Sequence, residues 1–168
     1  MKQKVVAKQP NSKMCYVCGL KNAVGLQASF FELESVEVVA QFRPGDAYQG
    51  YPGQLHGCIA AGLLEETMGR SIRTRYDAEA LGVTAELHLR FKAPVPLNET
   101  LNVIGRVTRD ARRLFEASAE LKLADGTVAV EASGRFLSLR GDRLPQEELE
   151  AQEWKVYPTA DDPLELNV

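Results

Sequence analysis

The stretch Gln54-Leu55-His56-Gly57 closes a loop and opens a helical pattern, and it decides the fold that this sequence predicts. From Cys58 to about Tyr76, apolar residues recur every three and four positions, which is the period of an α-helix buried on one side. The residues in this pattern are Ile59, Ala60, Leu63, Leu64, Thr67, Met68 and Ile72. The preceding segment, Arg43–Gly57, is rich in glycine and proline and therefore predicts a long surface loop.

Strand patterns flank the predicted helix. Before it, Gly25–Leu33 and Val36–Phe42 are rich in aromatic and β-branched residues, with a turn candidate at Glu34-Ser35 between them. Directly after it, Val83–Lys92 alternates between apolar and polar residues, which predicts a half-buried strand. We expect its apolar face to hold Val83, Ala85, Leu87, Leu89 and Phe91, and its polar face to hold Thr84, Glu86, His88, Arg90 and Lys92.

Further strands are predicted at Leu101–Thr108, Glu116–Leu123 and Val128–Leu139, with a turn at residues 124–127. The order is therefore two strands, one long helix, and then three or four strands. This order predicts an α+β fold in which a curved antiparallel sheet wraps one long central helix.

The length of 168 residues and the hydrophobic content of 45% fit one substantial core. We expect an N-terminal segment with a CxxC turn at residues 1–24, the folded domain at residues 25–140, and an acidic C-terminal tail at residues 141–168. The tail has a short helix candidate at Gln146–Trp154, and its final residues are expected to be loosely attached.

The charge balance excludes two classes of partner. With 20 basic and 23 acidic residues, the formal net charge is -3, so no overall positive field favours nucleic acid or an anionic membrane. No stretch approaches the roughly 20 apolar residues of a spanning helix, and the segment Met1–Pro10 has lysines but no apolar core of signal-peptide length. These features predict a soluble cytoplasmic protein with no nucleic-acid or membrane partner.

Three cysteines cannot form a fully paired disulfide framework within one chain, which favours a reducing compartment. Cys15 and Cys18 have the spacing of half a zinc site, but a closed structural site needs four ligands. Two subunits could each supply one pair, or His56 or His88 could complete a site. The alternative is a pair of reduced cysteines in a capping turn. We predict neither a metal nor a cofactor.

An ordered set of short motifs points to a family. Cys15-Tyr-Val-Cys18-Gly19 is followed by Asn22, Gly25-Leu26, His56-Gly57, Val83–Leu87, Arg90-Phe91 and Pro94. From Met14 to Leu139, this set resembles the phenylacetate-degradation-type acyl-CoA thioesterases of the hotdog-fold thioesterase superfamily. The resemblance implies hydrolysis of an acyl-CoA thioester to a free acid and CoA, by a homodimer or a dimer of dimers. It departs from the usual pattern at Cys58, where relatives have a second glycine.

The predicted helix start suits a catalytic oxyanion site. The first backbone N–H groups of a helix have no partner within it, and the helix dipole makes that end positive. Gly57 could direct one such N–H at the thioester carbonyl, although a glycine there could also serve only a tight turn. His56 and Gln54 are candidates for positioning the substrate or a water molecule. Cys58 is predicted to bind the substrate, because its thiol narrows the room near the carbonyl while its amide remains available; the alternative is a nucleophilic role, since helix N-termini favour thiolates.

Helical spacing separates two adjacent glutamates. Glu65 shares a stripe of small residues with Cys58, Ala61, Gly62 and Gly69, where a substrate could approach. Glu66 instead points towards Arg70, four residues on, and is expected to form an ion pair on the helix surface. We therefore predict that Glu65 is the general base or the nucleophile, with both roles open. The resemblance agrees, because related thioesterases carry an acidic residue at this place.

The spacing of the two catalytic candidates predicts a shared site. Gly57 and Glu65 are eight residues apart, or about 12 Å along a helix, so one helix cannot bring both to one carbonyl. The two groups should come from antiparallel helices of two subunits. Arg90 and Lys92 are assigned to the CoA phosphates, and Arg109, Arg112 and Arg113 are further candidate cations. The alternatives are a hotdog hydratase or dehydratase and a non-catalytic protein that binds acyl thioesters or small ligands.

Overall fold

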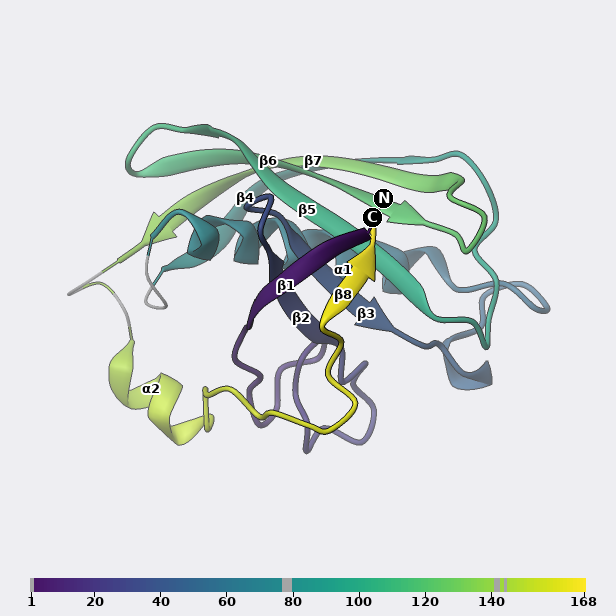
Figure 1. Ribbon diagram of the computed structural model, residues 1–168, viewed down its shortest axis with the longest axis horizontal. Coiled ribbons are helices and arrows are strands. Elements are labelled where there is room, and N and C mark those ends of the chain that lie inside the picture. Colours follow the sequence, from purple (N-terminus) through teal and green to yellow (C-terminus); the bar gives the residue numbers. More distant parts are fainter. Residues whose placement is uncertain (1, 77–79, 141–142, 144) are drawn as a thin grey trace.

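The computed structural model describes residues 2–76, 80–140, 143 and 145–168. Along the chain (Figure 1), its elements are β1 (Lys2–Lys8), β2 (Ser29–Leu33), β3 (Val38–Phe42), η1 (Asp46–Tyr48), α1 (Gly57–Arg70), η2 (Ser71–Thr74), β4 (Leu81–Phe91), β5 (Leu101–Asp110), β6 (Leu114–Lys122), β7 (Val128–Leu139), α2 (Gln146–Ala151) and β8 (Glu165–Asn167). No helix within these ranges is long and apolar enough to cross a lipid bilayer.

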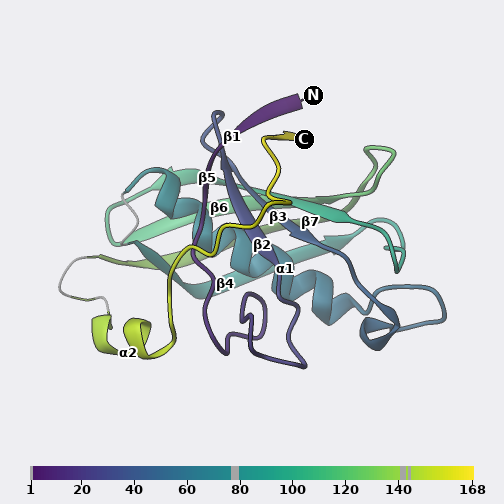
Figure 2. The ribbon, with the colours of Figure 1, turned by 60° about the horizontal axis from the view of Figure 1, so that its bottom comes forward.

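The strands form one antiparallel sheet that curves around α1. The strand order is β4-β7-β6-β5-β3-β2-β1-β8, so β4 and β8 are its two edges. Strands β5, β6 and β7 are consecutive neighbours, as the predicted meander requires. Figures 1 and 2 show α1 lying along one face of the sheet. The predicted α+β architecture, with one long central helix inside a curved antiparallel sheet, is confirmed.

The core lies between α1 and the sheet. Leu63, Leu64 and Met68 on α1 are fully buried, and they pack with sheet residues such as Phe115 and Phe136. Burying each such side chain contributes about 2 kcal/mol of hydrophobic stabilisation. The α-helix ends at Arg70, where Ser71 Oγ donates a hydrogen bond to the Met68 carbonyl, and the chain continues as the 3-10 turn η2. The predicted end at about Tyr76 was therefore a few residues too late.

Strand β2 begins at Ser29 and not at Gly25, as the sequence predicted. The backbone N–H groups of Leu26 and Ala28 donate to the carbonyls of Tyr16 and Val17, in the segment that carries the two N-terminal cysteines. These residues therefore bond to another loop and not to a neighbouring strand.

Both ends of the chain join the sheet. Strand β1 pairs with β2, and β8 pairs with β1. Leu166 is buried in a small second cluster with Phe31 and Ile104. The expectation of a loosely attached C-terminus is therefore wrong, and β1 was missed. The predicted short helix of the tail is present as α2, whereas the expected boundary at residues 140 and 141 adjoins residues outside the described ranges.

Candidate active site

The N-terminus of α1 leaves one backbone donor open. His56 is the N-cap residue, and its Nδ1 accepts a hydrogen bond from the Cys58 N–H at 3.1 Å. The N–H groups of Ile59 and Ala60 donate to the His56 carbonyl. The exposed N–H of Gly57 has no partner in the described part of the chain, so it is the donor available to an incoming oxyanion. The amide of Cys58, in contrast, is engaged by His56.

The loop before α1 is fixed to the body of the protein at two points. The Leu55 N–H donates to the Val95 carbonyl, and the His56 N–H donates to the Tyr48 carbonyl. Gly50 packs closely on His56, because a Cβ added at Gly50 would lie 3.1 Å from the His56 Cα. These contacts hold His56 and Gly57 in place at the helix start. Gln54 lies in the same loop with an exposed side chain, so it can reach a ligand.

Glu65 is a half-buried carboxyl group on α1. Burial raises its pKa, a hydrogen bond from Thr84 Oγ1 lowers it in part, and the neighbouring Glu66 raises it further. Glu65 lines a cavity of about 230 Å³ together with residues such as Cys15, Gly69, Gly82 and Trp154. A carboxyl group with a raised pKa is a better proton acceptor near neutral pH than an ordinary glutamate.

Thr84 is a site residue that the sequence pattern placed on the wrong face. A β-bulge lies between Thr84 and Glu86, and it shifts the alternation of β4 by one residue. Thr84 therefore pairs with the fully buried Phe136 and faces α1, whereas Val83 is 46% exposed. Beyond the bulge, Leu87 and Leu89 are partly buried as predicted. Periodicity alone gives no signal for the bulge.

Glu66 forms the predicted ion pair with Arg70, with Oε1 and Nε 2.7 Å apart. The expectation of a surface pair is wrong, because Arg70 is only 5% exposed. Its guanidinium lies 4.1 Å from the Phe30 ring centre and 4.8 Å from that of Trp154, and it donates to the Pro10 carbonyl. Segments from both ends of the chain thus cover this face of α1.

The stripe of small residues on α1 contacts the same chain. Gly62 faces Val17 of the N-terminal segment, and Gly69 faces the backbone of Gly82 on β4. A Cβ on Gly82 would lie 2.6 Å from the Gly69 carbonyl oxygen, so this approach requires glycine. The stripe therefore brings β4 against α1 beside Glu65.

Cys15, Cys18 and Glu66 place their candidate ligand atoms within 4.8 Å of one another. Both cysteines are free thiols, and Cys18 is buried. The hydrogen bond from Cys15 lowers the pKa of Cys18 to about 6, and the same bond together with burial raises that of Cys15. Three donors are one short of a closed structural zinc site. The described residues of one chain thus supply an incomplete site.

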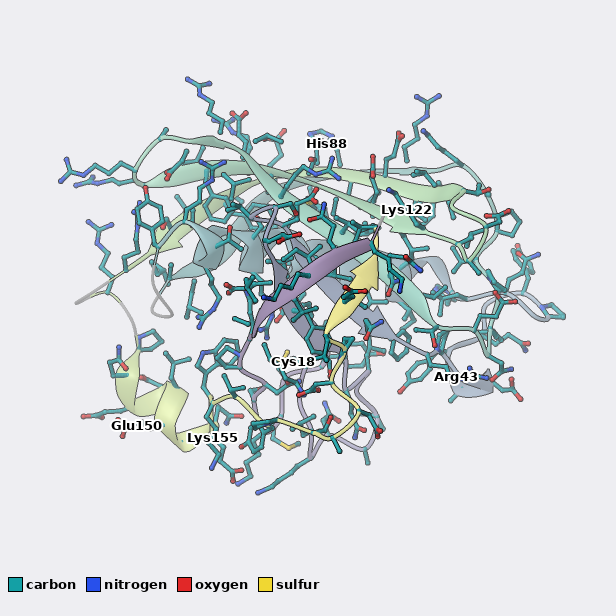
Figure 3. The ribbon with its side chains drawn as sticks, viewed as in Figure 1. Cys18, Arg43, His88, Lys122, Glu150 and Lys155 are labelled. Carbon is teal, nitrogen blue, oxygen red and sulfur yellow. The ribbon has the colours of Figure 1, made fainter. Side chains whose placement is uncertain are left out.

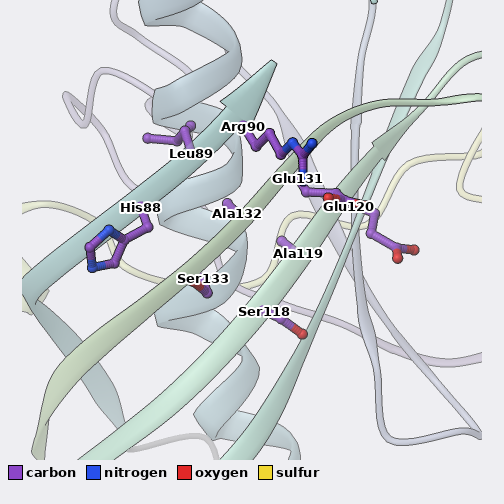
Figure 4. A pocket seen from close by; sticks show the side chains of 9 residues that line it. All are labelled: His88, Leu89, Arg90, Ser118, Ala119, Glu120, Glu131, Ala132 and Ser133. Carbon is purple, nitrogen blue, oxygen red and sulfur yellow. The ribbon is translucent and has the colours of Figure 1, made fainter. Parts of the chain in front are cut away.

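The candidate cation Arg90 lies at the far end of β4 from Thr84, and Lys92 directly follows the strand. Figure 4 shows Arg90 in a cavity of about 360 Å³ that also includes His88 and Glu131. Lys92 forms an ion pair with Glu131, and His88 Nε2 lies 2.7 Å from Glu86. As predicted, His88 lies on the sheet face away from α1, and Figure 3 shows it across the sheet from Cys18.

One chain does not bring the catalytic candidates together. Gly57 is the first residue of α1, and Glu65 follows within the same continuous helix. The intervening rise is about 12 Å. Strand β4 runs beside this helix and contacts it near both candidates. A Cβ on Gly57 would lie 3.5 Å from the Phe91 ring, and Thr84 donates a hydrogen bond to Glu65. Cys58 is exposed beside Gly57.

Comparisons with known proteins agree with this architecture. Residues 52–130 match the family model of the thioesterase superfamily. The chain is 28% identical to acyl-coenzyme A thioesterase THEM4 of Mus musculus, over 67% of this chain and 47% of that protein. It is 27% identical to acyl-coenzyme A thioesterase THEM5 of Homo sapiens, over 66% and 44%. The chain thus spans about half the length of the curated relatives it matches.

Solved structures share the fold. The crystal structure of a thioesterase superfamily protein is 30% identical to this chain, with a TM-score of 0.67 over 73% of this chain and 59% of that one. A Bacillus halodurans protein crystallised with CoA has a TM-score of 0.55 at 19% identity, over 60% of this chain and 70% of that one. At this identity, the similarity supports a shared fold and nothing further. The predicted resemblance is confirmed at the level of the superfamily, and its phenylacetate-degradation-type branch stays a prediction.

Proposed function

We propose that the protein hydrolyses an acyl-CoA thioester to a free acid and CoA. Its residues 52–130 match the family model of the thioesterase superfamily, and its fold is the hotdog fold of that superfamily. The observation that carries the proposal is the open N–H of Gly57 at the N-terminus of α1. The relatives named as acyl-coenzyme A thioesterases support the same reaction.

The proposed chemistry combines two groups. The Gly57 N–H and the positive end of α1 stabilise the carbonyl oxygen as it gains charge, a contribution of about 3 kcal/mol in the transition state. Glu65 either takes a proton from the attacking water or attacks the carbonyl carbon itself. In both cases the carbon–sulfur bond breaks, water supplies the hydroxyl of the acid, and the CoA thiolate leaves and gains a proton.

His56 and Gln54 have positioning roles in this proposal. Because Nδ1 of His56 accepts the Cys58 N–H, its role as N-cap fixes the ring beside Gly57. A hydratase or dehydratase would need the histidine to move protons at the acyl carbons, and the capping bond leaves Nε2 for such a transfer. Gln54 has an exposed amide that can bind the carbonyl or the attacking water.

We assign the complete site to a homodimer that pairs through β4. This strand is an edge of the sheet, with 46% of Val83 and 55% of Phe91 exposed. An exposed apolar edge strand favours pairing with another strand. If two copies of β4 pair about a two-fold axis near residues 87 and 88, Thr84 of one lies opposite Phe91 of the other. Glu65 then faces Gly57 of the partner subunit. Two such dimers could associate further.

Turnover of a panel of acyl-CoA thioesters tests the reaction, with CoA release followed by a thiol-reactive chromophore. Glu65→Gln should lower kcat about 100-fold or more, because it removes the base or nucleophile. Glu150→Gln on α2 is the matched control, since Glu150 is exposed and does not line the cavity beside Glu65. If wild type binds acyl-CoA but turns over no thioester, the hydrolase proposal is wrong. Undiminished turnover by Glu65→Gln would reject only the assignment of Glu65 as base or nucleophile, and not the hydrolase proposal.

A further inference from the structure

Two cysteines of the N-terminal segment and one glutamate of α1 gather around a single point. The Sγ atoms of Cys15 and Cys18 and a carboxylate oxygen of Glu66 lie within 4.8 Å of one another, and no other group of three or more candidate ligands does so among the described residues. Zinc bonds of about 2.0–2.3 Å set tetrahedral ligand atoms about 3.5–3.8 Å apart. Small side-chain rotations would therefore place all three atoms around one ion.

The turn that carries the two cysteines is already formed. The Cys18 N–H donates to Cys15 Sγ at 3.3 Å, and the Gly19 N–H donates to the Cys15 carbonyl at 2.8 Å. A Cβ added at Gly19 would lie 2.3 Å from that carbonyl oxygen, so the tight turn requires glycine. An N–H that donates to sulfur also stabilises the thiolate form, which is the form that binds metal ions.

A second layer of polar groups holds this turn against the body of the protein. The amide of Asn11 donates to the carbonyls of Cys18 and Ala28 at 2.8 and 2.9 Å, and both Asn11 and Cys18 are buried. Ser12 Oγ accepts the Cys15 N–H at 3.1 Å and lies 3.6 Å from Cys18 Sγ. Hydrogen bonds of this kind orient the residues that bind a metal ion.

The charges around the cluster suit a divalent cation. Arg70 Nε donates to Glu66 Oε1 at 2.7 Å, which fixes the carboxylate and leaves Oε2 for an ion. Two thiolates and one carboxylate carry three negative charges, and a zinc ion with the Arg70 guanidinium carries three positive charges. With neutral thiols, the Glu66–Arg70 pair is balanced as well. One zinc ion thus replaces two thiol protons and leaves no uncompensated charge in this buried region.

We propose that Cys15, Cys18 and Glu66 bind one zinc ion, with a water molecule as the fourth ligand. Two thiolates favour zinc over magnesium or calcium, and a zinc site with three protein ligands keeps its fourth position for water. Cys15 and Glu66 both line the cavity of about 230 Å³ beside Glu65, which gives this water room. The ion joins the N-terminal segment to α1. Zinc binding does not depend on the proposed hydrolysis, so either can fail alone.

The metal content of the full chain tests the site. Protein purified with a reducing agent and without chelators should contain about one zinc ion per chain by elemental mass spectrometry, and Cys15→Ser should contain almost none. Cys58→Ser is the matched control, because Cys58 lies outside the cluster, and it should keep its zinc. Wild type that neither contains zinc nor binds added Zn²⁺ would overturn the proposal. Undiminished zinc in Cys15→Ser would overturn it as well.

Titration with Co²⁺ tests the ligand set in the wild-type chain. Bound Co²⁺ should give the absorption bands of tetrahedral thiolate coordination, and added Zn²⁺ should remove them. Glu66→Gln should weaken zinc binding about 100-fold or more, although its amide oxygen can still accept the bond from Arg70. Glu150→Gln is the matched control and should bind as wild type does. Half an ion per chain, with unchanged affinity in Glu66→Gln, would place the ion between cysteine pairs of two subunits and overturn Glu66 as a ligand.

Thermal unfolding tests whether the ion joins the two segments. A chelator should lower the unfolding temperature of wild type and added Zn²⁺ should restore it, because an ion that binds the folded state stabilises that state. Neither addition should affect Cys15→Ser. An equal effect of the chelator on wild type and Cys15→Ser would overturn the assignment, whatever the activity of either protein.

Discussion

Replacing Gly57 with proline removes the proposed oxyanion donor and little else. Gly57 is the first residue of α1, a position that proline favours because its missing N–H has no helical partner there. His56 has φ -66° and ψ 135°, the extended conformation that a residue before proline adopts. Gly57→Pro should therefore fold, and it should lower kcat about 100- to 1000-fold, which is the cost of losing one oxyanion donor.

The matched control is Gly57→Ala, which keeps the N–H. Its Cβ would lie 3.5 Å from the Phe91 ring, an ordinary contact, so most of the activity should remain. The assay compares kcat for both variants on one acyl-CoA thioester, with CoA release as the readout and thermal unfolding as the check on folding. Gly57→Pro should unfold no earlier than wild type, because proline restricts the unfolded chain. Wild-type kcat in a folded Gly57→Pro protein would refute the assignment.

The same variant tests whether two subunits share a site. Mixing Gly57→Pro chains with Glu65→Gln chains gives heterodimers in which one site has both intact groups and the other has neither. With random pairing, half of the dimers carry one active site of two, so about a quarter of wild-type activity should return. If each site were built within one chain, mixing would restore nothing. A homodimer that forms but shows no recovery would contradict the shared site.

Three further variants probe the surroundings of the site. Thr84→Val removes the hydrogen bond that lowers the pKa of Glu65, so this pKa should rise. In a plot of kcat/KM against pH, the acidic limb, where activity falls as Glu65 is protonated, should therefore move to higher pH. An acidic limb at the wild-type pH would contradict Glu65 as the ionising group. Gly82→Ala places a Cβ 2.6 Å from a carbonyl oxygen of α1 and should lower the free energy of unfolding by about 1–3 kcal/mol in urea titrations, whereas Gly45→Ala, with open space around it, should be neutral. Cys58→Ser should retain turnover, and its loss with substrate binding intact would support a nucleophilic thiol.

The parts of the fold that the sequence predicted are those with a strong local signal. Helix α1 follows from an apolar repeat at helical spacing, and β5, β6 and β7 follow from alternation and turn residues. Gly57 was assigned because it opens the predicted helix after His56, and Glu65 because of its helical stripe and the family resemblance; neither assignment needs tertiary information. The proposed dimer rests on the rise per residue of a helix, which separates Gly57 from Glu65 along α1.

The missed features depend on contacts between distant segments. Strand β8 has only three residues, and β1 contains three lysines and no fully buried residue, so neither has a strong local signal; they form because they pair with each other and β1 with β2. The bulge at Thr84 shifts the faces of β4 by one residue, and no alternation pattern reveals where a bulge falls. The burial of Arg70 is set by Trp154, which is far along the chain. Such features are fixed by tertiary packing and not by local propensity.

Glu65 and Glu66 show how tertiary contacts give adjacent, chemically identical residues different roles. Glu66 lies against Arg70, which neutralises its charge, and its carboxylate is therefore held as a structural partner. Glu65 accepts a hydrogen bond from Thr84 and forms no ion pair among the described residues, and burial is the main cause that raises its pKa. A partly buried carboxylate without a counter-ion has high free energy and accepts a proton readily. Because Arg70 is paired with Glu66, Glu65 is left without an ion-pair partner among the described residues, which suits the role of base or nucleophile that we propose for it.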